Sequence, residues 1–234
     1  GTAMAAGGED VADAKSHTSA SDQKPGEIMR ANGAVYAGQV RRSSACGRGV
    51  QRWSEGAVYD GEWVDDVMHG EGTLTTSEGA RYEGRWSSGS QHGEGAYIMP
   101  DGSRYSGQWR NGKMHGTGRY LWPDGSVFTG QFAEGERTGQ GHLVYANGSI
   151  YEGAWLNNQQ HGIGISTTKG GRSRRGEWVQ GRRQAWLTDL TAVSRSLPCS
   201  FEVEAPPRPM PRTGPLPQEV ERCAEKCTTA CAAM

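Results

Sequence analysis

The chain has 234 residues, of which 34% are hydrophobic and 36 are glycine, and its formal net charge is −1. It contains eight Trp and eight Tyr but few aliphatic residues, so its core has to be built from aromatic rings. The near-zero charge argues against a nucleic-acid partner. The sequence contains no run of about 18 apolar residues, which a transmembrane helix would need.

Residues 1–31 form the first segment and contain mainly Ala, Ser, Asp, Glu and Lys without hydrophobic periodicity. This composition predicts a disordered N-terminal segment. The segment lacks the apolar core of a signal peptide and the arginines of a transit peptide, and we interpret Met4 as the native first residue. We therefore expect a cytoplasmic location with reduced cysteines.

Residues 32–181 contain a motif that returns every 23 residues. It reads YDGEW at Tyr59, and its counterparts begin at Tyr82, Tyr105, Phe128 and Tyr151. Columns of glycine follow the same period and extend the pattern to seven units. A strict period of this length predicts a repeat array in which each unit completes its core with its neighbours.

Each unit reads as one β-hairpin. From Tyr105 to Trp109 the large residues alternate with polar ones, which is the period of a strand, so Tyr, Gly and Trp share one face. Turn residues follow, a second strand returns over 118–122, and Pro123-Asp124-Gly125 leads into the next unit. We predict an all-β fold, an elongated single antiparallel sheet of about seven stacked β-hairpins. The glycines would make room for a ladder of Tyr rings and a ladder of Trp rings.

Beyond the array the composition changes again. Residues 182–197 contain an apolar stripe formed by Trp186, Leu190, Val193 and Leu197, which predicts a short amphipathic helix that caps the open sheet edge. Residues 198–217 contain seven prolines and are predicted to form a stiff linker. Residues 218–234 are expected to form a helical tail that contains cysteines.

The repeat unit carries a family resemblance. The pattern Y-x-G-x-W-x2-G-x2-H-G-x-G, nearly complete over 82–95 and 105–118, resembles the MORN repeat, whose period is also 23. The end units depart from it at Val40, Cys46 and Arg174, where Trp, His and Tyr would stand. The resemblance implies a mostly non-catalytic scaffold at membranes, cytoskeletal structures or ciliary axonemes.

The sequence offers little catalytic chemistry. Residues 107–113 have the spacing of a P-loop, but Met114 stands where Ser or Thr would hold magnesium, and the repeat explains the glycines. One histidine per unit forms a row, with members roughly 9 to 10 Å apart, too far to converge on one zinc ion: His69, His92, His115 and His161. We expect no enzymatic activity, no cofactor and no metal site.

The candidate partner-binding residues come from the second strands, because the first-strand rings are used for stacking. They are Tyr97, Tyr120, Trp122 and Tyr145. Aromatic side chains are common anchors at interfaces, and a long sheet face can receive an extended segment or a helix. We therefore predict a protein partner, such as a cytoskeletal or assembly subunit.

A second candidate surface is basic. Five arginines crowd the last unit, with only Glu177 among them: Arg172, Arg174, Arg175, Arg182 and Arg183. Such a cluster could contact anionic lipid head groups. The alternative is a set of solvated arginines at the edge of the sheet.

The last four residues, Cys231-Ala232-Ala233-Met234, have the form of a CaaX prenylation box that favours farnesyl. Cys223 and Cys227 precede it at intervals of four and are candidates for palmitoylation. Two alternatives remain for these three cysteines. They could form an apolar stripe that docks back on the protein, or a metal site, which would lack a nearby fourth ligand.

These observations lead to one main hypothesis and two alternatives. The main one is a non-catalytic scaffold at the cytoplasmic face of a membrane, held by a prenyl group and a second signal and linking the membrane to a cytoskeletal partner. The first alternative is a structural subunit of a ciliary or flagellar axoneme that resembles radial-spoke head proteins, or of another large assembly. The second is a phosphoinositide-binding module.

Overall fold

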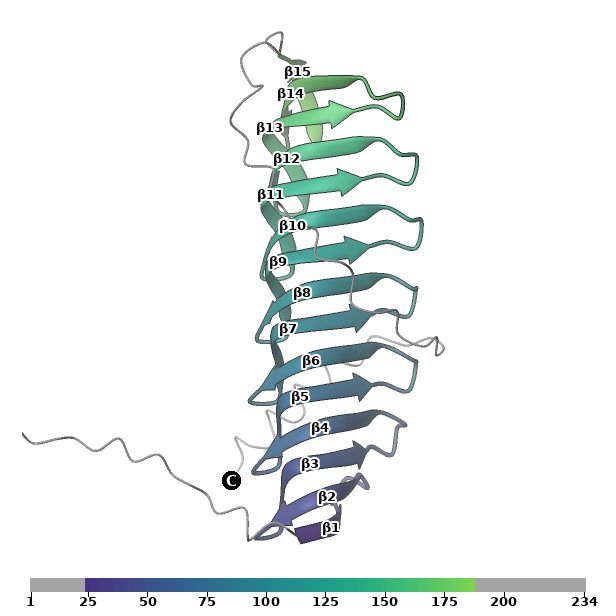
Figure 1. Cartoon of the computed structure of the whole chain (residues 1–234), viewed down its shortest axis with the longest axis vertical. Helices are drawn as coiled ribbons and strands as arrows, with labels where there is room; N and C mark the ends of the chain where they lie inside the picture. Colours follow the sequence, from purple (N-terminus) through teal and green to yellow (C-terminus); the bar gives the residue numbers. More distant parts are fainter. Residues whose placement is uncertain (1–23, 188–234) are drawn as a thin grey trace, which may run out of the picture.

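The computed structural model describes residues 24–187, which form one open antiparallel sheet of 15 strands with no helix in this range (Figure 1). The strands pair strictly in chain order, which confirms the predicted single sheet of stacked hairpins. They are β1 (Lys24–Met29), β2 (Val35–Arg41), β3 (Ser44–Arg52), β4 (Val58–Val64), β5 (Val67–Thr75), β6 (Arg81–Ser87), β7 (Ser90–Ile98), β8 (Arg104–Arg110), β9 (Lys113–Leu121), β10 (Val127–Ala133), β11 (Glu136–Val144), β12 (Ile150–Leu156), β13 (Gln159–Thr167), β14 (Ser173–Val179) and β15 (Arg182–Trp186).

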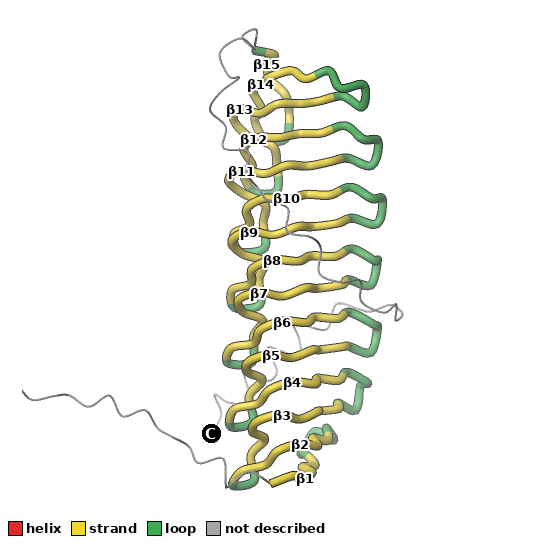
Figure 2. The backbone as a smooth tube through the Cα atoms, viewed as in Figure 1, coloured by secondary structure: helices red, strands yellow, loops and turns green. Residues whose placement is uncertain are grey.

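A continuous row of glycines crosses the sheet from β1 to β14. In β8 and β9, Gly107 pairs with Gly118, and Gly118 pairs in turn with Gly130 of β10. The register shifts within most hairpins directly after this glycine. Because each hairpin repeats the same bulge and the same glycine pair, the connecting turns stack along the molecule (Figure 2).

The glycine row leaves space for the ring of the first-strand tyrosine. Tyr105 lies across Gly107 and Gly118, and a Cβ on Gly118 would sit 2.4 Å from the Tyr105 hydroxyl oxygen. The Tyr105 hydroxyl donates a hydrogen bond to the carbonyl of Gln108 (2.9 Å). Each such tyrosine therefore covers the backbone of its own unit.

The aromatic rings form one alternating column rather than separate ladders of Tyr and Trp. Trp86 lies edge to face between Tyr59 of the preceding unit and Tyr82 of its own unit, with ring centres 5.2 and 5.1 Å away. Its indole Nε1 donates to the carbonyl of Gly72 (3.1 Å). Edge-to-face contacts of this kind are favoured over face-to-face stacking by the ring quadrupoles. The column joins successive units into one core.

Both ends of the sheet differ from the sequence prediction. Lys24–Met29, which were placed in the disordered segment 1–31, form β1 and pair with β2, so the sheet has 15 strands. Arg182–Trp186, which were assigned to the capping helix 182–197, form β15 instead, because the free edge of β14 offers backbone hydrogen-bonding groups. The predicted linker 198–217, the tail 218–234 and the rest of the helix lie outside the described residues. Within 24–187 there is no helix with the length and apolar character needed to cross a membrane.

Candidate functional site

The sheet is bent at the glycine row, so that its two arms face each other. Arg137 is the second residue of β11, and Trp122 directly follows the last residue of β9. The two residues therefore stand at opposite ends of their strands, and in straight strands these ends would lie about 26 Å apart. The Arg137 guanidinium carbon nevertheless lies 5.1 Å from the Trp122 ring centre. We call the face that carries the Tyr and Trp rings the concave face, and the opposite one the outer face.

The concave face is closed in the first units and opens toward the C-terminal end. One row of side chains on this face begins with buried Trp53 (8% exposed) and Thr76, continues with half-buried Met99 and Trp122, and reaches Tyr145 at 37% exposed. A second row, on the other arm, changes in the same direction, from buried to exposed, through Ala45, Met68, Gln91, Met114, Arg137, Gln160 and Arg183. The accessible part of the concave face is therefore formed by β7 to β14.

The four predicted partner-binding residues all lie on this open part. Tyr97 and Tyr120 are half-buried, and Tyr97 packs edge to face on Trp109 with ring centres 6.0 Å apart. Tyr120 packs on Trp122 at 4.6 Å, and its hydroxyl contacts the Met99 sulfur at 3.2 Å. The Tyr145 hydroxyl accepts a hydrogen bond from the Gln160 amide (2.9 Å), which orients the ring. Residues 24–187 contain no helix and no second sheet that could pack over this face.

Arg137 is a half-buried cation on the same surface that the sequence analysis did not identify. Its guanidinium carbon lies 4.7 Å from the ring centre of Trp155 and 5.5 Å from that of Phe128, in addition to the Trp122 contact. Its Nη2 donates to the carbonyl oxygen of Asn158 (2.9 Å). Burial lowers the pKa of Arg137, and the nearby Tyr145 and Tyr120 hydroxyls act in the opposite direction.

The repeat pattern itself could have identified Arg137 as unusual. In the same 23-residue column stand Met68, Gln91, Met114 and Gln160, so Arg137 is a charged residue at a position that faces the aromatic core. A charge at a core-facing position is uncommon without a partner, and such departures from a repeat pattern point to function. This column lies outside the rows of Gly, Tyr, Trp and His that define the repeat motif.

Arg30 forms an ion pair on the closed part of the concave face. Its Nη2 lies 2.8 Å from the Asp66 carboxylate, and its Nε donates to the Gln51 side chain (2.9 Å). Asp66 also accepts the backbone N–H of Ala45 (2.8 Å). Burial alone would raise the pKa of Asp66, but these hydrogen bonds outweigh it and hold the pKa below its ordinary value. The pair joins the two arms of the sheet.

The five arginines of the last unit do not form one surface. Arg174 pairs with Ser166 and Arg183 pairs with Trp178, which places both arginines on the concave face. Their guanidinium carbons lie 5.7 and 4.2 Å from the ring centre of Trp186. Arg175 and Arg182 point to the outer face, and Arg172 lies in the preceding turn. The cluster predicted from the sequence is thus divided between two faces.

The cysteines and the histidine row singled out in the sequence form no binding site among the described residues. Cys223, Cys227 and Cys231 lie outside the described residues, and Cys46 is buried with a free thiol. The histidine row runs over the outer part of the second strands, where His69 and His92 are exposed. Within residues 24–187 no three His, Cys, Asp or Glu side chains come close enough to hold a metal ion.

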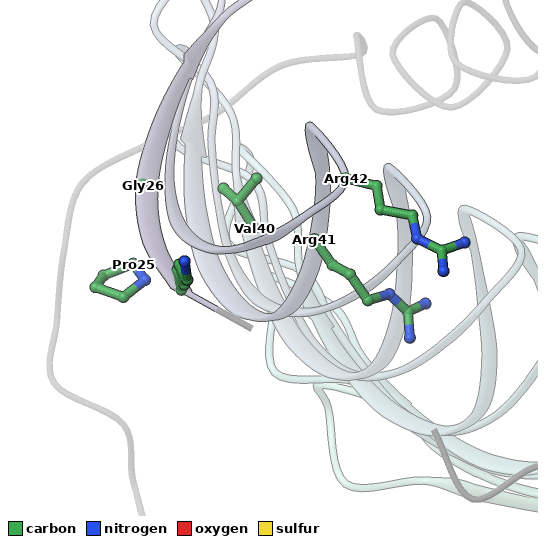
Figure 3. Close-up of a pocket in the computed structure, with 6 residues that line it drawn as sticks. Pro25, Gly26, Val40, Arg41 and Arg42 are labelled. Carbon is green, nitrogen blue, oxygen red and sulfur yellow. The ribbon is translucent and has the colours of Figure 1, made fainter. Parts of the chain in front are cut away.

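One pocket of about 470 Å³ lies at the N-terminal end of the sheet and is wide open. It is lined by Lys24, Pro25, Gly26, Val40, Arg41 and Arg42. Figure 3 shows the Arg41 and Arg42 side chains extending on the side of Val40 away from Pro25. Arg41 already pairs with Asp65 (3.3 Å). The pocket lacks the enclosed apolar wall and convergent polar groups that small-molecule sites have.

Comparison with known families gives one match. The model described as MORN repeat matches six consecutive segments, which together cover more than half of the chain: residues 36–58, 59–81, 82–104, 105–127, 128–150 and 151–171. The structure adds the β14–β15 hairpin in the position of a seventh unit. No curated protein sequence matches the chain significantly.

Solved structures with similar chain paths are distant. The TCP domain of SAS-4 (dCPAP) of Drosophila melanogaster, in complex with a proline-rich motif of Ana2 (dSTIL), is 10% identical and has a TM-score of 0.36, covering 80% of this chain and 98% of that one. The G-box domain of the microcephaly protein CPAP is 11% identical, with a TM-score of 0.25 and coverage of 69% and 97%. Virginiamycin B lyase of Staphylococcus aureus is 10% identical, with a TM-score of 0.20 and coverage of 67% and 56%. Likeness at this level carries no information on function.

Proposed function

We propose that this chain, which belongs to the MORN-repeat family, is a non-catalytic scaffold that binds a protein partner on the open part of its concave face. The observation that supports this proposal is the change in burial along the array. The row that is closed at Trp53 leaves Trp122 half-buried and Tyr145 exposed, and the row that is closed at Met68 leaves Arg137 half-buried. Large aromatic side chains held on a rigid sheet are suitable anchors, because they bury much area and lose little conformational entropy.

The open surface is apolar in the middle and charged only at Arg137 and near the last hairpin. An extended segment or a helix lying along it would contact several units, since each unit presents the same rows every two strands, about 9 to 10 Å apart. This spacing suits a partner segment with apolar residues at regular intervals. The proposal therefore concerns a linear peptide segment rather than a globular surface.

Site-specific photocrosslinking tests this proposal. A benzophenone amino acid replaces Tyr145 on the concave face or, as a matched control, Leu156 on the outer face; the two native side chains are 37% and 46% exposed. In cells, we expect a discrete crosslinked partner from position 145 and none from position 156. Trp122→Ala should abolish the adduct while circular dichroism stays unchanged. Equal crosslinking from both positions would contradict binding at the concave face.

We further propose that the scaffold is attached to a membrane through the C-terminal cysteines. The support is the CaaX form of residues 231–234 together with Cys223 and Cys227, since one farnesyl chain anchors only marginally and needs a second signal. Cys231→Ser should move the protein to the soluble fraction, and Cys223→Ser with Cys227→Ser should weaken attachment without blocking prenylation. Identical fractionation of wild type and Cys231→Ser would favour the alternative, a subunit of an axoneme or another large assembly.

Direct phosphoinositide binding by the array has less support. The last-unit arginines are divided between the two faces, so a flat membrane could engage only part of them at once. Replacing Arg175 and Arg182 with Gln removes the outer-face pair and replacing Arg174 and Arg183 removes the concave-face pair. Vesicle binding that depends on either pair alone would revive this alternative.

A further inference from the structure

We propose that Arg137 is the centre of a site that binds a carboxylate group, supplied by an Asp or Glu of a polypeptide partner lying on the open concave face. The inference rests on the proposed function and specifies one chemical feature that the partner must carry. It starts from a cation that is half-buried among Trp122, Phe128 and Trp155.

The first argument is that Arg137 lacks a counter-ion. No carboxylate among residues 24–187 forms an ion pair with its guanidinium. Ring faces attract a guanidinium, but they do not accept its hydrogen bonds, and a partly desolvated cation without an anion is unfavourable. Asn158 accepts from Nη2, which leaves the Nη1 side of the planar group for a ligand. A carboxylate would complete this arrangement.

The second argument is a comparison within the chain. On the closed part of the same face, Arg30 has its own carboxylate, Asp66, at 2.8 Å. Both arginines face the opposite arm of the bent sheet and both are half-buried. The closed part thus pairs its cation internally, whereas the open part holds its cation between rings without an internal anion. This difference coincides with the opening of the concave face.

The third argument concerns the class of anion. The neighbours of Arg137 in its row, Met114 and Gln160, are uncharged, so one positive charge stands alone and matches a monoanion better than a phosphate dianion. Gln160 donates to the Tyr145 hydroxyl, which leaves the hydroxyl proton of Tyr145 to be donated in turn. Arg137 and Tyr145 together can bind the two oxygens of one carboxylate.

The fourth argument is that the fold does not need an arginine here. Arg137 stands opposite Phe132, and the equivalent places opposite Trp63 and Trp109 are taken by Met68 and Met114. A methionine of similar length therefore fits the position. Arg137→Met is a variant that removes the charge and keeps the packing, which separates binding from folding.

The test uses short random peptides displayed on phage and selected on the immobilised full-length chain. We expect the enriched peptides to share an Asp or Glu at a fixed distance from an aromatic or aliphatic residue. For a synthetic member of this set, Glu→Gln in the peptide and Arg137→Met in the protein should each weaken binding by about 10- to 100-fold. In the Arg137→Met protein the Glu and Gln peptides should bind equally. Arg137→Lys should restore part of the affinity, and Tyr145→Phe should cost several-fold.

Two controls separate this inference from the proposed function. Trp122→Ala should abolish binding of every selected peptide, and Arg119→Met, on the outer face, should change nothing. If peptides bind in a Trp122-dependent way but tolerate loss of their acid or of Arg137, the carboxylate site is wrong and the proposed function stands. If no peptide binds in a Trp122-dependent way, both proposals fail.

Other occupants give distinguishable results. Phosphatidylcholine vesicles doped with phosphatidylinositol bisphosphate should bind wild type and Arg137→Met alike; selective loss in the variant would assign the site to lipid phosphate and overturn the proposal. The chain's own Glu202 and Glu204 are a further source of carboxylates. If Glu202→Gln with Glu204→Gln strongly increases peptide affinity, the chain's own tail occupies the site, which would overturn the assignment to a partner.

Discussion

The glycine row allows a stability prediction that does not depend on any partner. In Gly118→Ala the added methyl carbon would lie 2.4 Å from the Tyr105 hydroxyl oxygen and 2.5 and 2.6 Å from two of its ring carbons. The ring cannot stay in place at these distances. Tyr105 is 1% exposed and packs on Trp109 and Phe132 with ring centres 5.2 and 5.1 Å away. Losing an aromatic side chain from a core costs about 3–5 kcal/mol, and partial relaxation reduces this. We expect Gly118→Ala to lower the free energy of unfolding by about 3 kcal/mol.

A double-mutant cycle with Tyr105→Ala isolates the cause. The backbone of Gly118 lies outside the left-handed region, so without the ring the extra methyl should cost less than about 0.5 kcal/mol. Gly102→Ala is the control, because Gly102 has φ +88° and nothing within 4 Å of the added carbon. It should cost about 1 kcal/mol in both backgrounds, from backbone strain alone.

Urea unfolding followed by circular dichroism measures these differences, and amide hydrogen exchange locates them. Because each unit contacts only its neighbours, the loss of protection in Gly118→Ala should centre on β8 to β10. If Gly118→Ala costs the same with and without the Tyr105 ring, the ring is not what requires the glycine, and the explanation of the glycine row is wrong.

Three further predictions concern charge and titration. Asp66→Asn should lower the free energy of unfolding by about 1–3 kcal/mol at pH 7. The pKa of Asp66 is lowered in the folded state, so the difference between wild type and variant should be complete above the pKa of the unfolded chain, about 3.9, and should vanish as the pH falls through the pKa of the folded state. Unfolding curves recorded at a series of pH values measure this difference. Burial raises the pKa values of Tyr59 and Tyr82. Their contribution to stability should therefore be complete below about pH 10 and be lost as the pH rises above it, and the two phenols should ionise only as the array unfolds. Phenolate absorbance that rises before the loss of circular dichroism would contradict this. Arg137→Met should leave the melting temperature unchanged or higher, because it removes a partly desolvated cation; a marked decrease would show that the rings depend on the charge.

The repeat units could be predicted from the sequence because two periodicities coincide in them. The period of 23 sets the unit, and the period of two within Tyr105–Trp109 puts Tyr, Gly and Trp on one face. The alternation of Tyr and Trp rings could not be predicted in this way. It depends on the bend at the glycine row, which moves each Trp between two tyrosines. The spacing of residues along the sequence does not indicate where a sheet bends.

The two ends were mispredicted for physical reasons that can be named. Lys24–Met29 contain neither Tyr nor Trp, but Gly26 continues the column of Gly49 and Gly72 one period back, and this single residue marks β1. At the other end Trp186 fits a helical stripe and also fits a strand beside Gly176. The helical stripe leaves the backbone of β14 unpaired, whereas the strand satisfies it.

The candidate binding surface contains the residues predicted from the sequence because of how the repeat divides its residues. The motif positions are used by the fold: Tyr59, Tyr82 and Tyr105 are at most 1% exposed, and their hydroxyl groups already donate to the backbone. Residues that recognise a partner must therefore come from the columns that the motif leaves free. Three such columns face the concave side, and they contain the candidates Tyr120 and Trp122 as well as Arg137.

The opening of the concave face follows from the residues in these free columns. At the N-terminal end they place Trp53 and Met68 in the buried core, and the ion pair of Arg30 and Asp66 joins the arms. Toward the C-terminal end the same columns contain the polar or charged side chains of Gln160, Thr168 and Arg183, which favour contact with water over burial. A uniform backbone repeat thereby acquires a closed half and an open half, and the position of the boundary is set by residues outside the repeat motif.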